Sequence, residues 1–226
     1  MKKPIVISLG GSLIVPDKID DKFLKNFRDT ILKFVKRGWH FIIVAGGGHT
    51  CRLYQAAAKK VGPISKEDVD WIGIHATHLN AHLLRTIFRK YAHLRVLTHY
   101  TEKEPIPEPI VVAAGWRPGH STDFDAISFA KLYGCDTVIN LSDIRYVYDK
   151  DPDKFPGANP LKKISWEDFR EIVGDVWVPG DKLPFDPIAS KLAHESGLKV
   201  VTLSGNNLQN FENFLGGKDF EGTVIS

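Results

Sequence analysis

Short apolar runs alternate along the chain with longer segments in which apolar residues recur every three or four positions. Runs rich in valine and isoleucine are typical of buried strands, and the wider spacing is typical of helices with one buried face. The runs predict strands at 4–9, 40–45, 94–97, 110–113, 137–141, 200–203 and 223–225, the last at the edge of the sheet. The spaced segments predict helices at 23–35, 50–61, 65–91, 123–133, 186–195 and 208–215, and another beginning at Ser165.

Glycines and serines mark where the predicted helices end and begin. Gly38, Gly134 and Gly197 each follow a helix and precede a strand, a place where glycine readily takes the left-handed conformation. Ser65 and Ser165 each stand three residues before an aspartate, as in a capping box. Alternating strands and helices indicate βαβ units, so we predict an α/β fold, a three-layer αβα sandwich with a mainly parallel central sheet.

Composition narrows the class of protein. With 226 residues, 43% of them hydrophobic, the chain is long enough to bury one good core, and we expect a single domain over 1–226. The 30 basic and 27 acidic residues form no run of five like charges, so we expect no nucleic-acid partner. No apolar stretch is long enough to span a bilayer, and we expect a cytoplasmic protein with no membrane contact. The two cysteines, Cys51 and Cys135, fit neither a disulfide framework nor a zinc motif.

Two glycine-rich loops carry the first chemical signal. Gly10-Gly11-Ser12 and Gly46-Gly47-Gly48 each follow a predicted buried strand and precede a helix. Backbone amides and a helix N-terminus in that arrangement attract an anion, and in a parallel sheet both loops lie at strand carboxyl ends. One such loop alone is as readily explained by a tight turn, whereas two on one edge favour phosphate. Neither loop matches the Walker A or dinucleotide-binding pattern.

Further motifs extend this signal over almost the whole chain. In order they are IVISLGGS (5–12), VAGGGHTCR (44–52), PGHSTD (118–123), LSD (141–143), VYDKDP (147–152) and DPIASK (186–191). In this order they resemble the amino acid kinase superfamily, whose fold is carbamate kinase-like, and most of all its archaeal-type UMP kinases. The resemblance implies transfer of the ATP γ-phosphate to UMP, giving UDP for pyrimidine nucleotide biosynthesis. It also implies Mg²⁺ with the ATP, a homohexamer, an acceptor-binding half of about 1–134 and a nucleotide-binding half of about 135–226.

The resemblance also assigns roles to residues. It implies that ATP is bound by Gly10, Gly11, Ser12, Gly48, Arg52, Ser142, Tyr148 and Asp151. It implies that UMP is bound by Gly47, Asp70, Arg117, Gly119, His120, Ser121, Thr122 and Asp123. The catalytic candidates are Asp186, Asp143 and Lys191. Because a phosphate monoester has a second pKa of about 6, the acceptor is already largely dianionic and needs no general base. We therefore expect positioning and charge neutralisation to carry the reaction, with Arg52, Arg117 and Lys191 as the candidate cations.

Three positions depart from the pattern of these kinases. Ser8 stands where many members have a lysine, although archaeal-type relatives can also lack it. Arg145-Tyr146 precedes the Val-Tyr element where the family usually has Asp-Gly, and His78 stands where relatives often have an arginine. Lys182, in the loop before Asp186, is a candidate replacement for the missing charge.

Other functions stay open at this point. Asp186 resembles the UMP kinases, whereas Leu-Ser-Asp143 resembles acetylglutamate kinases, so a sister kinase acting on a carboxylate is one alternative. A non-catalytic protein of the same fold that binds a nucleotide or an oxyanion is the other. His75, His78 and His82 share a helical face, which predicts a subunit contact or core stripe in preference to a metal site. We expect no metal bound by the side chains themselves.

Overall fold

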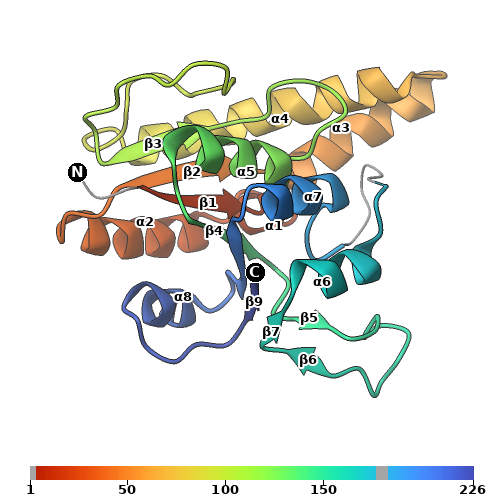
Figure 1. The fold of residues 1–226 in the computed structure, drawn as a ribbon. Coiled ribbons are helices and arrows are strands. Elements are labelled where there is room, and N and C mark those ends of the chain that lie inside the picture. The colour runs from red at the N-terminus through yellow and green to blue at the C-terminus, as the bar shows by residue number, and fades with distance from the viewer. Residues whose placement is uncertain (1–3, 177–182) are drawn as a thin grey trace.

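Apolar segments from the whole chain pair into one central sheet (Figure 1). The computed structural model describes residues 4–176 and 183–226; Lys182 lies outside them. The sheet has the order β3-β2-β1-β4-β8-β9-β7, and within the described residues only its β8–β9 pair is antiparallel. The strands are β1 (Ile5–Leu9), β2 (Phe41–Ala45), β3 (Ile110–Ala113), β4 (Thr137–Ser142), β7 (Lys163–Ile164), β8 (Lys199–Ser204) and β9 (Thr223–Ile225); a separate hairpin pairs β5 (Val147–Tyr148) with β6 (Pro160–Leu161).

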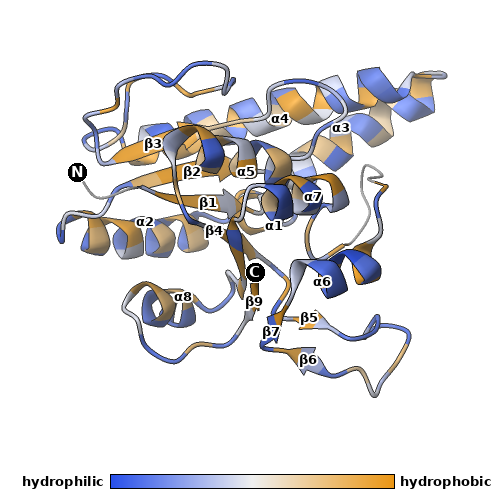
Figure 2. Ribbon diagram, viewed as in Figure 1, coloured by the Kyte–Doolittle hydropathy of each residue, from blue (hydrophilic) through white to orange (hydrophobic). Residues whose placement is uncertain are grey.

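Helices cover both faces of this sheet. They are α1 (Gly11–Ile14), α2 (Asp21–Val35), α3 (Gly48–Val61), α4 (Lys66–Ile87), α5 (Thr122–Tyr133), α6 (Trp166–Val173), α7 (Pro187–Glu195) and α8 (Leu208–Leu215). Alternate strand residues enter two separate cores: Ile7 and Ile43 pack with α2, α4 and α8, whereas Val6 and Ile42 pack with α5, α6 and α7. The strands are accordingly hydrophobic on both faces and the helices on one (Figure 2). The predicted α/β three-layer architecture is confirmed.

The glycines and the serine cap in the sequence correctly predicted the helix ends before Gly38, Gly134 and Gly197 and the helix start after Ser65. Gly38, Gly134 and Gly197 have φ angles of 81°, 68° and 62°, the left-handed region that glycine enters without strain. The Ser65 side chain accepts a hydrogen bond from the amide of Asp68, whose carboxylate reaches back to the amide of Ser65, completing the capping box. None of the described helices combines the length and apolar character needed to cross a membrane.

Two strand predictions were wrong. Residues 94–97 form no strand, because the chain touches β3 only at Ala92 and Leu97 and swings away between them, leaving Leu94 exposed. Residues 223–225 do form a strand, but β9 is not at the edge, since the two-residue β7 pairs along its outer side. Strands as short as β7 and helices as short as α1 carry no readable periodicity.

The strand order determines where a ligand site can form. β2 lies on one side of β1 and β4 on the other, so the chain reverses its direction across the sheet at β1. A crevice opens at the carboxyl ends of parallel strands at such a switch point. Here the loop after β1 meets the loop after β2: a Cβ built on Gly11 would lie 2.7 Å from the carbonyl carbon of Gly46 and closer still to the amide nitrogen of Gly48.

This contact between the glycine loops can be tested by adding one methyl group. We expect Gly11→Ala to lower the free energy of unfolding by about 1–3 kcal/mol, because two backbone segments must separate to admit it. Gly62→Ala is the matched control, since Gly62 is extended at φ −179° and no described atom lies within 4 Å of its added Cβ. Urea denaturation of both variants would contradict the contact if the two changes cost the same.

Candidate active site

A cleft of about 1450 Å³ opens at the carboxyl ends of β1, β2 and β4. It is lined by residues from both the 1–134 and the 135–226 parts of the chain. Thirteen of the residues to which the sequence assigned a catalytic or binding role line this cleft: Gly10, Ser12, Gly47, Gly48, Arg52, Asp70, His120, Thr122, Asp123, Ser142, Asp143, Tyr148 and Asp151. Residues from Ser8 to Asn206 therefore meet at one site, as expected where parallel strands end together.

Two helices begin at the glycine loops, so their N-terminal amides lie beside the cleft. α1 starts at Gly11 and α3 at Gly48, which has a positive φ of 64°. The buried side chain of Asn80 on α4 holds the second loop by donating to the carbonyl oxygens of Gly46 at 2.7 Å and Gly47 at 3.1 Å. Helix N-termini with free amides attract anions. The two glycine loops thus meet at helix starts beside one cleft, and phosphate binding there stays a prediction.

The loop 115–121 forms the opposite wall and is tied to α4 at several points. Asp70 accepts a hydrogen bond from the amide of Gly119 at 2.8 Å. Thr77 accepts from the amide of Gly115 at 2.9 Å, and a His78 ring nitrogen lies 2.8 Å from the Gly115 carbonyl oxygen. His78 therefore holds the loop in place rather than facing the cleft as a cation.

His120 is the ring that this loop turns toward the cleft. It stacks on Phe124 with the ring centroids 4.2 Å apart, and its buried Nδ1 has no hydrogen-bond partner among the described residues. Burial and the positive charge of Arg117 lower the pKa of His120. The imidazole is thus uncharged in the free protein at neutral pH and available to a ligand.

Six predicted site residues do not line the cleft. Gly11 is enclosed by the second glycine loop, Ser121 caps α5, and Gly119 forms a turn at φ 84°. Arg117 stacks on the Trp116 ring at 4.6 Å, and Lys191 is exposed on α7. Asp186, the sixth, lies buried behind the cleft floor and caps α7. The roles of all six stay predictions.

The end of β4 and the segment after it line another side of the cleft, with the residues Ser142, Tyr148 and Asp151. Arg145 lies at the same rim, with its guanidinium 2.7 Å from the carboxylate of Glu221. No described residue other than glycine has a positive φ, so Tyr146, at the usual glycine position of this element, introduces no backbone strain. Sequence reasoning assigned no role to Lys150, which lies inside the VYDKDP motif, or to Lys154, which lies outside every motif; both also line this rim.

Two carboxylates, those of Asp123 and Asp186, lie near each other where α5 and α7 begin. Ser8 donates a hydrogen bond of 2.7 Å to Asp123 at the start of α5. Burial and the nearby Asp186 raise the pKa of Asp123 to about 6, while the Ser8 hydrogen bond opposes the shift. Asp186 caps α7 through one oxygen, at 2.7 Å from the amide of Ala189, and its other oxygen is buried without a partner in the described chain.

Asp125, to which the sequence analysis assigned no role, lies two residues after Asp123 on α5. It is 1% exposed, and its Oδ1 has no hydrogen-bond partner among the described residues. Burial raises its pKa to about 8, and the charge of Asp123 adds to the shift. Its place in an otherwise apolar turn of α5, between Phe124 and Ala126, was the available signal.

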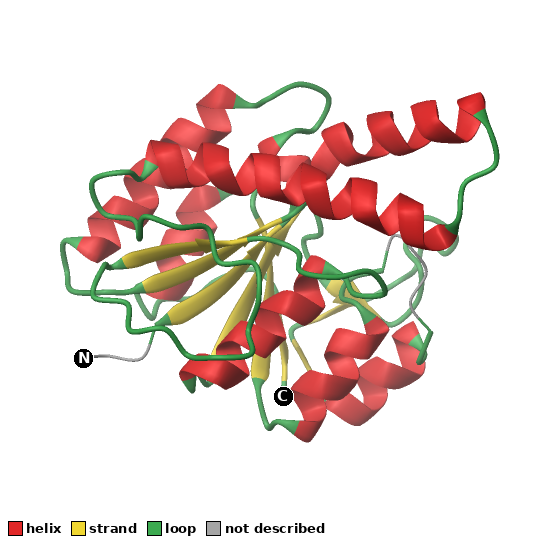
Figure 3. Ribbon diagram, turned by 90° about the horizontal axis from the view of Figure 1, so that it is seen from above, coloured by secondary structure: helices red, strands yellow, loops and turns green. Residues whose placement is uncertain are grey.

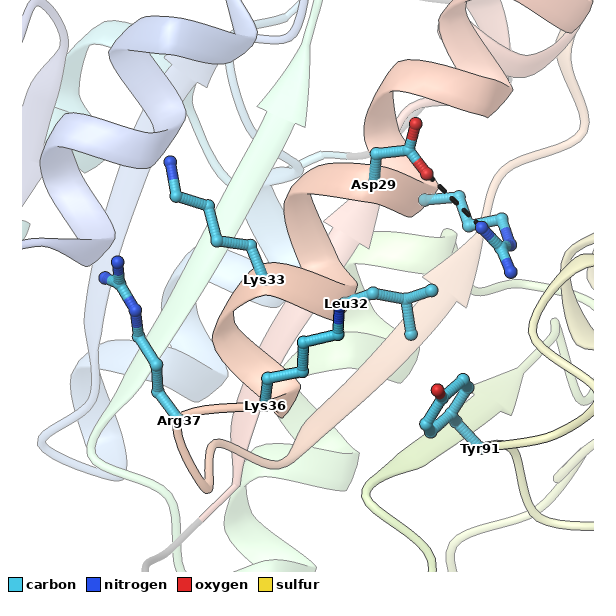
Figure 4. Close-up of a pocket in the computed structure, with 7 residues that line it drawn as sticks. Asp29, Leu32, Lys33, Lys36, Arg37 and Tyr91 are labelled. Carbon is cyan, nitrogen blue, oxygen red and sulfur yellow. Dashed lines mark hydrogen bonds and ion pairs between the residues drawn. The ribbon is translucent and has the colours of Figure 1, made fainter.

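A second cavity of about 610 Å³ lies against α2 (Figure 4). Its lining is Arg28, Asp29, Leu32, Lys33, Lys36, Arg37 and Tyr91. Two of its four cations already have partners, since Arg28 pairs with Asp29 and Lys33 with Glu212. Within residues 4–176 and 183–226, no group of three histidine, cysteine or acidic side chains is placed to hold a metal ion unaided.

Comparison with known proteins settles the family. The model of the amino acid kinase family matches residues 3–204. The chain belongs to this family. Two related kinases are the uridylate kinases of Pyrococcus abyssi, 32% identical over 98% of both chains, and of Methanosarcina barkeri, 35% identical over 93% of this chain and 91% of the relative. The crystal structure of uridylate kinase from Archaeoglobus fulgidus superposes with a TM-score of 0.84 at 30% identity, covering 99% of this chain and 100% of that one.

The raised pKa of Asp125 makes the free energy of unfolding depend on pH. Its raised pKa means that the folded state keeps a proton between about pH 4 and pH 8 that the unfolded chain has released, so stability falls as pH rises through this window. We expect Asp125→Asn to flatten that slope and to raise the free energy of unfolding at pH 8 by about 1–3 kcal/mol. Urea melts from pH 5 to pH 9 in EDTA would measure this.

The control is Asp153→Asn, an exposed carboxylate at the rim of the same cleft. It should keep the wild-type slope. Because Asp123 titrates near pH 6, the decisive range is pH 6 to 8: a slope that survives Asp125→Asn there would show that Asp125 is not the group that holds the proton.

Proposed function

We propose that this chain is a UMP kinase, which transfers the γ-phosphate of ATP to UMP. The observation that carries the proposal is the meeting of two glycine loops, with two helix N-termini, at one cleft between the halves of the chain. A single loop would serve one phosphorylated ligand, whereas a pair serves a donor and an acceptor. The similarity of the chain to the uridylate kinases named above, over 93% to 99% of its length, supports the proposal.

The mechanism follows from the charges of the two substrates. UMP brings a dianionic phosphate with a second pKa of about 6, so the attacking oxygen needs no base to deprotonate it. When bound with ATP as the donor, Mg²⁺ would supply positive charge that offsets part of the negative charge on the transferring group. The protein must align the two phosphates, with Gly10 and Ser12 on the donor and Gly47 on the acceptor. The amides at the starts of α1 and α3 then stabilise charge that develops during transfer.

Recognition of the acceptor is proposed for the wall opposite the second glycine loop. Asp70 would accept from the ribose hydroxyls while it holds Gly119, and His120 and Thr122 would face the base and phosphate. On the donor side, Ser142, Tyr148 and Asp151 would surround the adenosine. These assignments rest on the family pattern and on the position of each residue along the cleft.

We further propose that the protein acts in the cytoplasm as a homo-oligomer, with a hexamer as the expected form. α3 and α4 form an antiparallel pair that reaches beyond the sheet (Figure 3). Apolar side chains on this pair are exposed to solvent, among them Leu53, Tyr54, Trp71 and Leu79. Such exposed apolar groups on one projection support a subunit contact.

The proposal is tested by the release of ADP from MgATP in a coupled assay. Turnover is expected with UMP, and little or none with AMP, acetylglutamate or carbamate; the ratio of CMP to UMP turnover measures base preference. Turnover with acetylglutamate alone would favour the sister carboxylate kinase. No turnover with any acceptor, while ATP still binds, would favour a non-catalytic nucleotide-binding protein.

A second prediction separates the charge of Asp186 from its structural role. Asparagine caps a helix as well as aspartate does, so Asp186→Asn should change the free energy of unfolding by less than about 0.5 kcal/mol. It removes the charge beside Asp123, and we expect kcat to fall at least about tenfold. Asp186→Ala should lose both the cap, about 1 kcal/mol, and the activity. Thermal melts and steady-state kinetics of both variants are the measurement; full activity in Asp186→Asn would make the residue purely structural.

A further inference from the structure

One departure from the family pattern adds an aromatic side chain to the surface of the cleft. Tyr146 stands at the position where these kinases usually have a glycine, which contributes no side chain. Tyr146 lines the cleft, as does Tyr148 two residues later. Both tyrosines are half-buried, so part of each remains open to a ligand. The side of the cleft proposed for the donor nucleotide thus carries two aromatic side chains.

Packing of the protein interior does not explain these two tyrosines. Among residues 4–176 and 183–226, neither of the two hydrophobic cores includes Tyr146 or Tyr148. Ile172, which is 40% exposed, lines the same cleft and adds a further apolar side chain. Apolar and aromatic side chains that stay partly exposed in a cleft are typical of ligand sites.

A charged neighbour orients the Tyr146 ring. The guanidinium carbon of Arg145 lies 5.7 Å from the centre of this ring, a cation–π contact. The same guanidinium donates two hydrogen bonds to one carboxylate oxygen of Glu221, from Nε at 3.2 Å and from Nη2 at 2.7 Å. An exposed ion pair of this kind contributes little to the stability of the fold. It does restrict the ring, which lowers the conformational entropy that a ligand must remove on binding.

Tyr148 forms the second wall of an aromatic corner. The centres of the Tyr146 and Tyr148 rings are 6.4 Å apart, and the ring planes are inclined at 79°. The backbone of Tyr148 is fixed by the hairpin, because β5 pairs Tyr148 with Pro160. A flat ligand that stacks on one of two perpendicular rings presents its edge to the other, and aromatic groups favour both arrangements. The corner therefore suits a planar heteroaromatic ring.

We propose that Tyr146, oriented by Arg145 and Glu221, is the stacking surface for the base of the donor nucleotide, with Tyr148 at the edge of that base. This inference rests on the proposed function, which makes the donor a nucleoside triphosphate. Arg145 occupies one face of the Tyr146 ring, so the base stacks on the other. Every base has a π face, and a purine offers a larger one than a pyrimidine. Tyr146 is thus a determinant of donor affinity and takes no part in the transfer step.

The test compares a ligand that has a base with one that has none. Isothermal titration calorimetry measures the binding of ATP and of inorganic tripolyphosphate to the full chain, each in the presence of Mg²⁺. We expect Tyr146→Leu, which keeps an apolar side chain but loses the ring, to weaken ATP binding about tenfold and to leave tripolyphosphate binding unchanged. Tyr146→Phe should keep the wild-type affinity for ATP.

Three results would overturn the proposal. The first is equal ATP affinity in wild type and Tyr146→Leu. The second is tighter ATP binding in Tyr146→Gly, since the ring would then obstruct the site. The third is an equal loss of ATP and tripolyphosphate binding in Tyr146→Leu, which would indicate general damage to the cleft. Phe155→Leu is the matched control, because Phe155 is an exposed aromatic residue of the same segment that does not line the cleft; it should bind ATP as wild type does.

The UMP assay is read separately from these titrations. A selective loss of ATP affinity in Tyr146→Leu, together with no UMP turnover by the wild-type protein, would keep the base site and reject the kinase function. UMP turnover by the wild-type protein, together with unchanged ATP affinity in Tyr146→Leu, would keep the kinase function and reject the base site.

Discussion

The close approach of the two glycine loops is the constraint on which the site depends. Gly11 and Gly46 leave no room for a Cβ between the ends of β1 and β2. Because the loops touch, α1 and α3 begin side by side and present their N-terminal amides to one cleft. Larger side chains at these glycines would separate the loops, and with them the places where two phosphates are expected to meet.

Electrostatics imposes the second constraint. Helix N-termini tolerate carboxylates near them, and Asp123 and Asp186 both stand at such ends. The pKa of Asp123 is nevertheless raised, because burial removes its carboxylate from water and the negative charge of Asp186 lies nearby. Such a floor costs stability in the free protein.

The three departures from the family pattern have different structural consequences. His78 contacts the carbonyl of Gly115, so it holds a loop where an arginine would bring charge. Arg145 pairs with Glu221 at the rim, and Tyr146 stands at the usual glycine position without adopting a positive φ. Ser8 alone changes the centre of the cleft, because it turns a position that often carries a lysine into a hydrogen-bond donor for Asp123.

The sequence by itself determined most of the framework: the α/β class, the buried strands, the helix ends at Gly38, Gly134 and Gly197, and the glycine loops. These features depend on residues a few positions apart, whose periodicity and caps are local. Tertiary structure alone decided that β9 lies inside the sheet and that residues 94–97 touch β3 without forming a strand. It also brought Asp123 to Ser8, 115 residues away, and buried Asp125. Such pairings depend on long-range strand order and on the burial that follows from it, and neither is written in any short segment of the chain.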